Sequence, residues 1–314
     1  MGTRVPLSVT DGNTYVSGGP VTLVDDALSE RLLRSTARQS YDPDVDLDWS
    51  APPVPGLWWM QPERMSLYDT PMWRSLGEEQ QITLSMHEVA SIASVGIWFE
   101  IVLMQILLRD AYREDPTSAR TQFALTEVGD ETRHTVMFGR AIGSMGVPAY
   151  GPRPTPHRLA RLGPLALRGA SAYAGILIGE EPVDRWQREM MRDERIQPLT
   201  RMVARIHVTE EARHVTFARD ELAKAVRGLG RTKLRWHQAM TAQVAYVTMR
   251  SLVHPDVYKV VGLDPQEARR QALGNESYRE TIAWMGEKVM PVLHENGMVS
   301  ERDRKVWRAS FLMR

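Results

Sequence analysis

Two five-residue motifs of one type carry side chains that can bind a metal ion. One reads DETRH and ends at His134, and the other reads EEARH and ends at His214. Positions three apart share one face of a helix, which would place Glu131 beside His134 and Glu211 beside His214. A carboxylate and an imidazole on one face can chelate a cation, and this mixture of oxygen and nitrogen donors suits iron or manganese.

One further glutamate lies the same distance before each motif. Glu100 is 31 residues before Glu131, and Glu180 is 31 residues before Glu211. The chain therefore predicts four helices around two metals, in which two helices give one carboxylate each and two give a Glu-x-x-His pair. Ferritin-like di-iron and di-manganese carboxylate bundles use this arrangement of ligands, and we expect Glu131, Glu211 or both to bridge the metals.

The equal spacing of the two sets favours metal ligands over ordinary polar residues on a solvated helix face. A single Glu-x-x-His pair is common on a solvated helix face, but apolar residues surround both motifs here, which argues against two such faces. Glu88 competes with Glu100 as the upstream carboxylate, and Glu181 competes with Glu180. The matched interval favours Glu100 and Glu180.

A third histidine distinguishes the second motif from the first. His207 lies four residues before Glu211, one helical turn away on the same face, whereas Glu127 holds the equivalent position before Glu131. We predict that His207 is a seventh ligand, with a core histidine as the alternative. Glu127 is expected beside the ligands or along a channel to them.

The remaining charged residues of the motifs are predicted to orient the ligands. Metal-bound imidazoles usually donate their second N–H to a carboxylate, which fixes the tautomer and the ring direction. Asp130 is placed to accept this bond from His214, across the bundle, and Glu210 to accept it from His134. The motif arginines, Arg133 and Arg213, would hold these acids. Ordinary salt bridges between helices are the alternative.

The elements that must position these residues are predicted to be all helical. Helical periodicity dominates after residue 77, and alternating strand patterns are scarce. A Pro/Gly-rich connector, residues 146–164, is long enough to cross over from the second core helix to the third. We expect one domain, residues 1–314, with an irregular N-terminal wrap (1–75), a metal-binding bundle (78–227) and covering helices (232–314). The expected helices span residues 78–113, 116–144, 164–193, 198–227, 232–253 and 275–295.

Composition excludes several classes of protein. Lys plus Arg equals Asp plus Glu, 39 of each, so no basic field is available for nucleic acid. The absence of cysteine removes disulfides and thiolate ligands. Residues 1–20 lack the apolar core of a signal peptide, and Pro6 breaks a myristoylation match, so we expect a cytoplasmic protein. The apolar run at 95–108 resembles a membrane span, but a central glutamate, Glu100, makes that costly.

Taken together, the motifs resemble the p-aminobenzoate N-oxygenases of the aureothin and chloramphenicol type. That family has two such upstream-glutamate and acid-Glu-x-x-His sets, with an extra histidine four residues before the second ligand glutamate. The resemblance covers roughly residues 78–227. The positions that match are Glu100, Glu131, His134, Glu180, His207, Glu211 and His214.

The resemblance implies a non-haem di-iron oxygenase of natural-product biosynthesis. It implies two Fe ions, O₂ as co-substrate, an electron donor and a small aromatic amine that is oxidised to a hydroxylamine, nitroso or nitro product. Mn fits the ligand set as well. A homodimer is compatible with it, and neither nucleic acid nor a membrane is expected as a partner.

Two other functions share part of this pattern. An acyl-carrier-protein desaturase or another di-iron hydroxylase would have the paired motifs without needing His207. A ferritin-like storage bundle would need no substrate pocket. Leu103, Met104 and Met137 could line such a pocket, although their helical spacing fits core packing at least as well.

Overall fold

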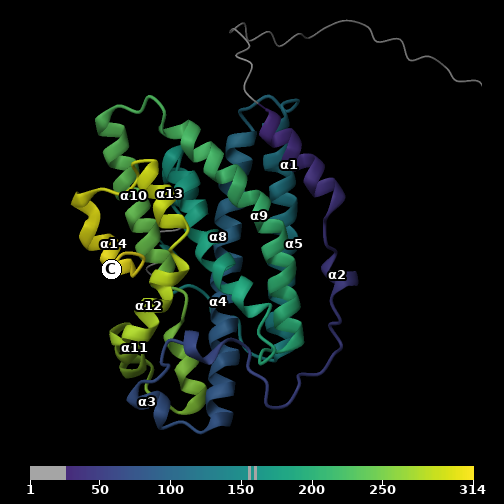
Figure 1. Ribbon diagram of the computed structural model, residues 1–314, viewed down its shortest axis with the longest axis vertical. Helices are drawn as coiled ribbons and strands as arrows, with labels where there is room; N and C mark the ends of the chain where they lie inside the picture. Colours follow the sequence, from purple (N-terminus) through teal and green to yellow (C-terminus); the bar gives the residue numbers. More distant parts are fainter. Residues whose placement is uncertain (1–25, 155–156, 159–160) are drawn as a thin grey trace, which may run out of the picture.

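Four long helices form the centre of the molecule. A computed structural model describes residues 26–154, 157–158 and 161–314, and the expectations about residues 1–20 lie outside these ranges. The core helices are α4 (Glu78–Ala111), α5 (Ala119–Met145), α8 (Ala170–Met190) and α9 (Pro198–Val226). α4 packs on α5, α8 packs on α9, and α5 and α9 close the bundle (Figure 1). The fold is all-α, and a ferritin-like helical bundle was predicted.

The predicted core helices need two corrections at their starts. α5 begins at Ala119 and not at Pro116, because the Ser118 side chain caps the helix by accepting a bond from the Thr121 N–H. The helix expected from residue 164 is two helices, α7 (Gly163–Ala166) and α8. Gly169 separates them with φ +48°, a conformation that favours glycine and that no α-helix contains.

The connector between α5 and α8 contacts α4 near both of its ends. Near its start, the Tyr150 hydroxyl hydrogen-bonds to His87, close to the first turns of α4. Near its end, Arg109 at the last turn of α4 donates to the Leu167 carbonyl over 2.8 Å. The chain therefore crosses over between the second and third core helices, as the length of this segment predicts.

The N-terminal segment is more helical than predicted. Within the part of residues 1–75 that the structure describes lie α1 (Ala27–Arg38), α2 (Pro43–Asp46), η1 (Pro62–Arg64) and α3 (Pro71–Arg74). α1 packs on α5 and α9 and buries Leu32 against them. The helical periodicity of α1 was missed because the sequence around it is rich in Pro, Gly and Asp.

Short helices after the bundle cover α8. The first is α10 (Arg231–Met249), which packs on α8 and on α14 (Arg304–Ser310). Next come η2 (Pro255–Val261), α11 (Pro265–Gly274), α12 (Glu276–Met285), α13 (Val289–Glu295) and η3 (Glu301–Asp303). The helix expected over residues 275–295 is interrupted at Gly286, and α11 was not predicted.

α4 is the one described helix that is long and apolar enough to cross a membrane, a test that core helices also pass. It packs on α5, α7, α8 and η2. Its central carboxylate, Glu100, is 2% exposed. These contacts agree with a core helix.

Candidate metal centre

The seven predicted ligands meet between the four core helices. α4 supplies Glu100 and α8 supplies Glu180, while α5 and α9 supply the histidines and the other glutamates. All seven side chains are buried, with at most 3% of any residue exposed. Together with Glu127, their donor atoms form overlapping groups of three whose members lie within 4.8 Å of one another. These groups are Glu100, His134 and His207; Glu131, His134 and Glu211; Glu180, His207 and Glu211; and Glu127, Glu131 and His214.

Glu131 and Glu211 occupy the middle of the centre. Glu131 lies 3.0 Å from Nδ1 of His134 through one oxygen and 3.1 Å from Nδ1 of His214 through the other. Glu211 Oε1 lies 3.0 Å from His214 Nδ1 and 3.6 Å from His134 Nδ1. Because each carboxylate reaches both imidazoles, either one could be shared between two metals.

The two imidazoles are held by acids from opposite helices. His134 Nε2 on α5 lies 2.8 Å from Glu210 on α9, and His214 Nε2 on α9 lies 3.2 Å from Asp130 on α5. These are the bonds across the bundle that the motifs predict. They direct Nδ1 of both rings to the centre, where a cation would replace the Nδ1 proton.

Two arginines and a backbone amide hold the orienting acids. Arg133 contacts Asp130 directly and lies 3.6 Å from Glu210. Arg213 lies 3.6 Å from Asp130 and 3.8 Å from Glu210. The Tyr41 N–H, between α1 and α2, donates to Glu210 over 3.1 Å. No pattern in the sequence indicated Tyr41, since its backbone rather than its side chain makes the bond.

These bonds keep the orienting acids ionised. Burial raises the pKa of Asp130 and of Glu210, but hydrogen bonds from His214 and His134 respectively outweigh it, so both pKa values fall below the ordinary range. Burial lowers the pKa of His134, yet bonds to Glu131 and Glu210 raise it to about 10. In the metal-free chain His134 is therefore a cation that stands between acids.

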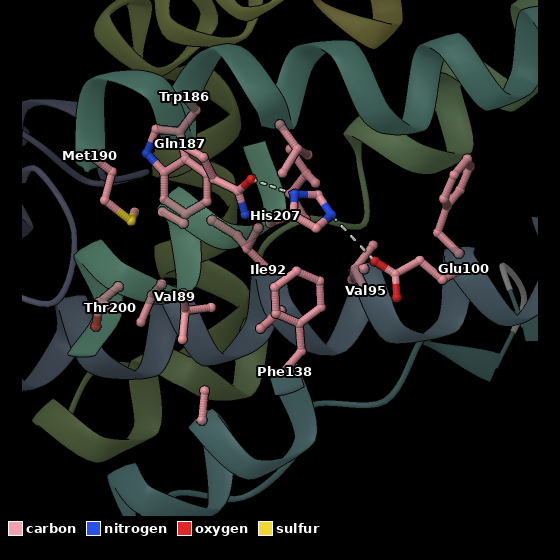
Figure 2. Close-up of a pocket in the computed structure, with 18 of the residues that line it drawn as sticks. Val89, Ile92, Val95, Glu100, Phe138, Trp186, Gln187, Met190, Thr200 and His207 are labelled. Carbon is pink, nitrogen blue, oxygen red and sulfur yellow. Dashed lines mark hydrogen bonds and ion pairs between the residues drawn. The ribbon is translucent and has the colours of Figure 1, made fainter. Parts of the chain in front are cut away.

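His207 presents Nε2 to the centre. This atom lies 3.6 Å from Glu100 Oε1 and 3.8 Å from Glu211 Oε1. On the other side of the ring, Nδ1 donates to Gln187 Oε1 over 2.6 Å, which leaves Nε2 free to act as a ligand (Figure 2). Glu100 in turn accepts a bond from Thr135 over 2.9 Å. Gln187 and Thr135 belong to neither motif, and no pattern in the sequence indicates them.

The centre holds more negative charge than its histidines balance. Burial, with the repulsion of neighbouring carboxylates, raises the pKa of Glu180 and of Glu127 well above the ordinary range. Burial also raises the pKa of Glu100, to about 7. Hydrogen bonds from His134 and His214 outweigh the burial of Glu131 and lower its pKa. A buried group of acids like this is stable only if it is protonated or bound to a cation.

Several donor atoms in the centre lack a hydrogen-bond partner among the described residues. They are Glu180 Oε1, Glu211 Oε2, His207 Nε2 and both oxygens of Glu127. Buried polar atoms in folded proteins are normally satisfied, so these atoms are available for metal ions. Carboxylate and imidazole donors of this number fit two ions of iron or manganese.

The competing glutamates lie elsewhere. Glu88 accepts hydrogen bonds from the Ser66 N–H and hydroxyl, and Glu181 pairs with Arg219. Neither belongs to a group of candidate ligands. The role of the seven chosen residues as metal ligands stays a prediction, but the structure brings them together and excludes these two neighbours from the cluster.

An apolar pocket opens onto one side of the centre. Glu100 and His207 lie at its inner end (Figure 2), and Glu180 also lines it. Most of the remaining wall is apolar and comes from the four core helices, with Gln187, Thr200 and Thr248 as its polar side chains. Leu103, Met104 and Met137 are absent from its wall. Leu103 and Met137 are buried in the core, and Met104 accepts a bond from Thr132.

Known proteins resemble this chain over most of its length. The family model described as P-aminobenzoate N-oxygenase AurF matches residues 24–297. An uncharacterized protein of Mycobacterium tuberculosis (strain CDC 1551 / Oshkosh) is 29% identical over 293 residues, which cover 88% of this chain and 84% of the relative. Uncharacterized proteins of Mycobacterium bovis and of M. tuberculosis strain H37Rv are each 28% identical over the same shares.

Proposed function

This chain belongs to the P-aminobenzoate N-oxygenase family, and from that premise we propose that it is a di-iron oxygenase that oxidises the amino group of a small aromatic amine. The observation that carries the proposal is the apolar pocket, which ends on three of the candidate ligands, Glu100, Glu180 and His207. A metal storage bundle has no need of such a pocket. A substrate in it would lie directly against the metals.

The seven predicted ligands would hold two irons, and Glu131 and Glu211 would be among the residues that bind them. Bound iron would supply the redox chemistry by which O₂ is reduced. Conversion of an amine to a hydroxylamine places one oxygen atom on nitrogen and turns the other into water, so a donor must provide two electrons and two protons. Further oxidation at the same nitrogen would give the nitroso and nitro products.

The chain's own side chains set the conditions for this chemistry. Helices hold every ligand, and acids or amides fix the imidazoles, so the donor atoms are preorganised. The apolar wall excludes water from the reacting nitrogen and limits loss of reactive oxygen species to solvent. Glu127, buried and unpartnered beside Glu131 and His214, is an additional carboxylate at the edge of the centre.

Product analysis with the iron-loaded protein tests the proposal. The protein is incubated with O₂, a chemical reductant and an aromatic amine, or in parallel with an acyl-carrier thioester, and products are identified by mass spectrometry. We expect hydroxylamine, nitroso or nitro products from the amine and no change in the acyl chain. A Glu131→Gln/Glu211→Gln variant serves as the metal-deficient control. Desaturation or hydroxylation of the thioester instead would overturn the proposal.

A further inference from the structure

The pocket that leads to the metal centre has a distinct far end. Its inner end carries Glu100 and His207, and Trp186, Met190 and Thr200 lie at the other (Figure 2). Trp186 is six positions after Glu180 on α8, and Thr200 is seven positions before His207 on α9. These intervals correspond to about 9 and 10 Å of helix rise. A benzene ring with an amine at one end and a short substituent at the other is long enough to reach from the metal end of the pocket to its far end.

No cation lines this pocket among the residues that the structure describes. Its titratable lining groups are Glu100, Glu180 and His207, all at the metal end. Between them and the far end the wall is formed by side chains such as Ile92 and Phe138 (Figure 2). A substrate carboxylate at the far end would lose its water without gaining an opposite charge, which is strongly unfavourable.

The far end instead offers hydrogen-bond donors that have no acceptor. Trp186 Nε1 and Thr200 Oγ1 are buried and lack a hydrogen-bond partner among the described residues. Trp186 is 3% exposed and Thr200 is 6% exposed. An indole N–H can only donate, and a threonine hydroxyl can donate as well. The two donors belong to different helices, α8 and α9, and lie apart at this end of the pocket (Figure 2), so each on its own could donate to a neutral oxygen on a ligand.

We propose that the substrate is an aromatic amine that carries a neutral carbonyl group, as in an ester or amide, at the end opposite the amine, and not a free carboxylate. Trp186 and Thr200 would be its specificity-determining contacts. The inference rests on the proposed function, because that function places the amine at the metal end. It differs from the substrate in the family's description, p-aminobenzoate, by the charge of a single group.

Binding to the anaerobic, iron-loaded protein tests this inference independently of turnover. Calorimetry would compare methyl p-aminobenzoate and p-aminobenzamide with p-aminobenzoate and with aniline, which has no acceptor. We expect the ester and the amide to bind at least tenfold more tightly than p-aminobenzoate. Equal or tighter binding of p-aminobenzoate, or no binding of any of these amines, would overturn the inference.

Two variants locate the contact. Trp186→Phe and Thr200→Val each remove a donor and keep most of the shape, so each should weaken ester binding by about three- to tenfold and leave aniline binding unchanged. Trp307→Phe is the matched control, because Trp307 Nε1 is also buried and unpartnered but lies outside the pocket. Loss of ester and aniline binding to the same extent in Trp186→Phe would contradict the assigned contact. If the ester binds as expected but no amine is oxidised, the proposed function fails and the pocket assignment stands.

Discussion

His207 is the predicted ligand that would make the two sides of the centre unequal, and its orientation depends on Gln187. Gln187 Oε1 binds Nδ1 and directs Nε2 to the site. A metal bound there would gain a neutral donor, which changes its charge and its open positions relative to the other metal. The two metals would then differ in how they handle O₂ and the amine.

We expect His207→Ala to keep the fold and lose function. The other six ligands still join the helices, so far-UV circular dichroism should match the parent. Metal affinity should fall by at least about tenfold, and most amine oxidation should be lost. Metal content per chain and product formation measure this, with the exposed His294→Ala as control. Unchanged occupancy and turnover would make His207 a core histidine and favour a desaturase or hydroxylase.

The buried carboxyl of Glu88, away from the metal centre, makes the free energy of unfolding depend on pH. Burial raises the pKa of its carboxyl to about 7, although hydrogen bonds from Ser66 oppose the rise. Tyr258 and Tyr278 face it and stay neutral, because burial raises their pKa values also. Between about pH 4.5 and 7 the folded chain holds this proton and the unfolded chain releases it. The free energy of unfolding therefore falls as pH rises through this window.

Glu88→Gln should remove this pH dependence. Relative to the parent, the variant should gain up to about 3 kcal/mol of stability when the pH is changed from 4.5 to 8. Urea unfolding of both proteins at these two pH values measures the difference. Glu79→Gln, at an exposed site on α4, should show no such change. A Glu88→Gln difference that is equal at both pH values would refute the assignment.

At the scale of elements, the sequence predicts the repeated motifs and the long periodic helices, but it does not predict short helices or single contacts between helices. The matched interval of 31 residues predicted that Glu100 and Glu180 join the cluster of acids and histidines, and both lie in it. Helical periodicity predicted the bounds of α4, α5 and α9 within a few residues. α1 and α11 were missed, because they are short and their stability comes from packing on other elements. Gln187 and Tyr41 could not be found, since their roles depend on which helices meet.

A close approach of α4 and α8 depends on Gly179. A Cβ at this position would overlap the ring of Phe99, which also borders the pocket. Gly179→Ala should therefore lower the free energy of unfolding by about 1 to 3 kcal/mol, and Phe99→Ala in the same chain should relieve the clash. Urea unfolding of the single and double variants measures this coupling.

Gly175→Ala is the control on the same helix. Its Cβ would meet Val244 at 3.6 Å, an ordinary contact, so helix propensity should make it neutral or stabilising by up to about 1 kcal/mol. Equal effects of the two glycine substitutions would show that the approach of Phe99 does not matter.

At the scale of the whole molecule, we expect metal binding to be linked to folding. The buried acids of the centre repel one another in the metal-free chain, and an ion bound only by the folded state stabilises it. At one hundred times its dissociation constant, a metal should add about 2.7 kcal/mol to the free energy of unfolding. We expect chelator treatment to lower Tm and Fe²⁺ or Mn²⁺ to restore it. The Tm of the Glu131→Gln/Glu211→Gln variant should not change when metal is added or removed. A Tm of the parent protein that does not depend on metal would exclude metal binding at this centre.

α5 and α9 contact each other through the same kind of bond in both directions, as the two copies do in a symmetric (isologous) dimer interface. Asp130 contacts His214 while Glu210 contacts His134, so each half of the chain presents to the other the surface that it receives. Such a surface is self-complementary, and two copies of either helical hairpin could make the same pair of bonds. The equivalent positions 127 and 207, glutamate in one half and histidine in the other, break this symmetry. This difference makes the two sides of the centre unlike, and the pocket lies on the side of His207.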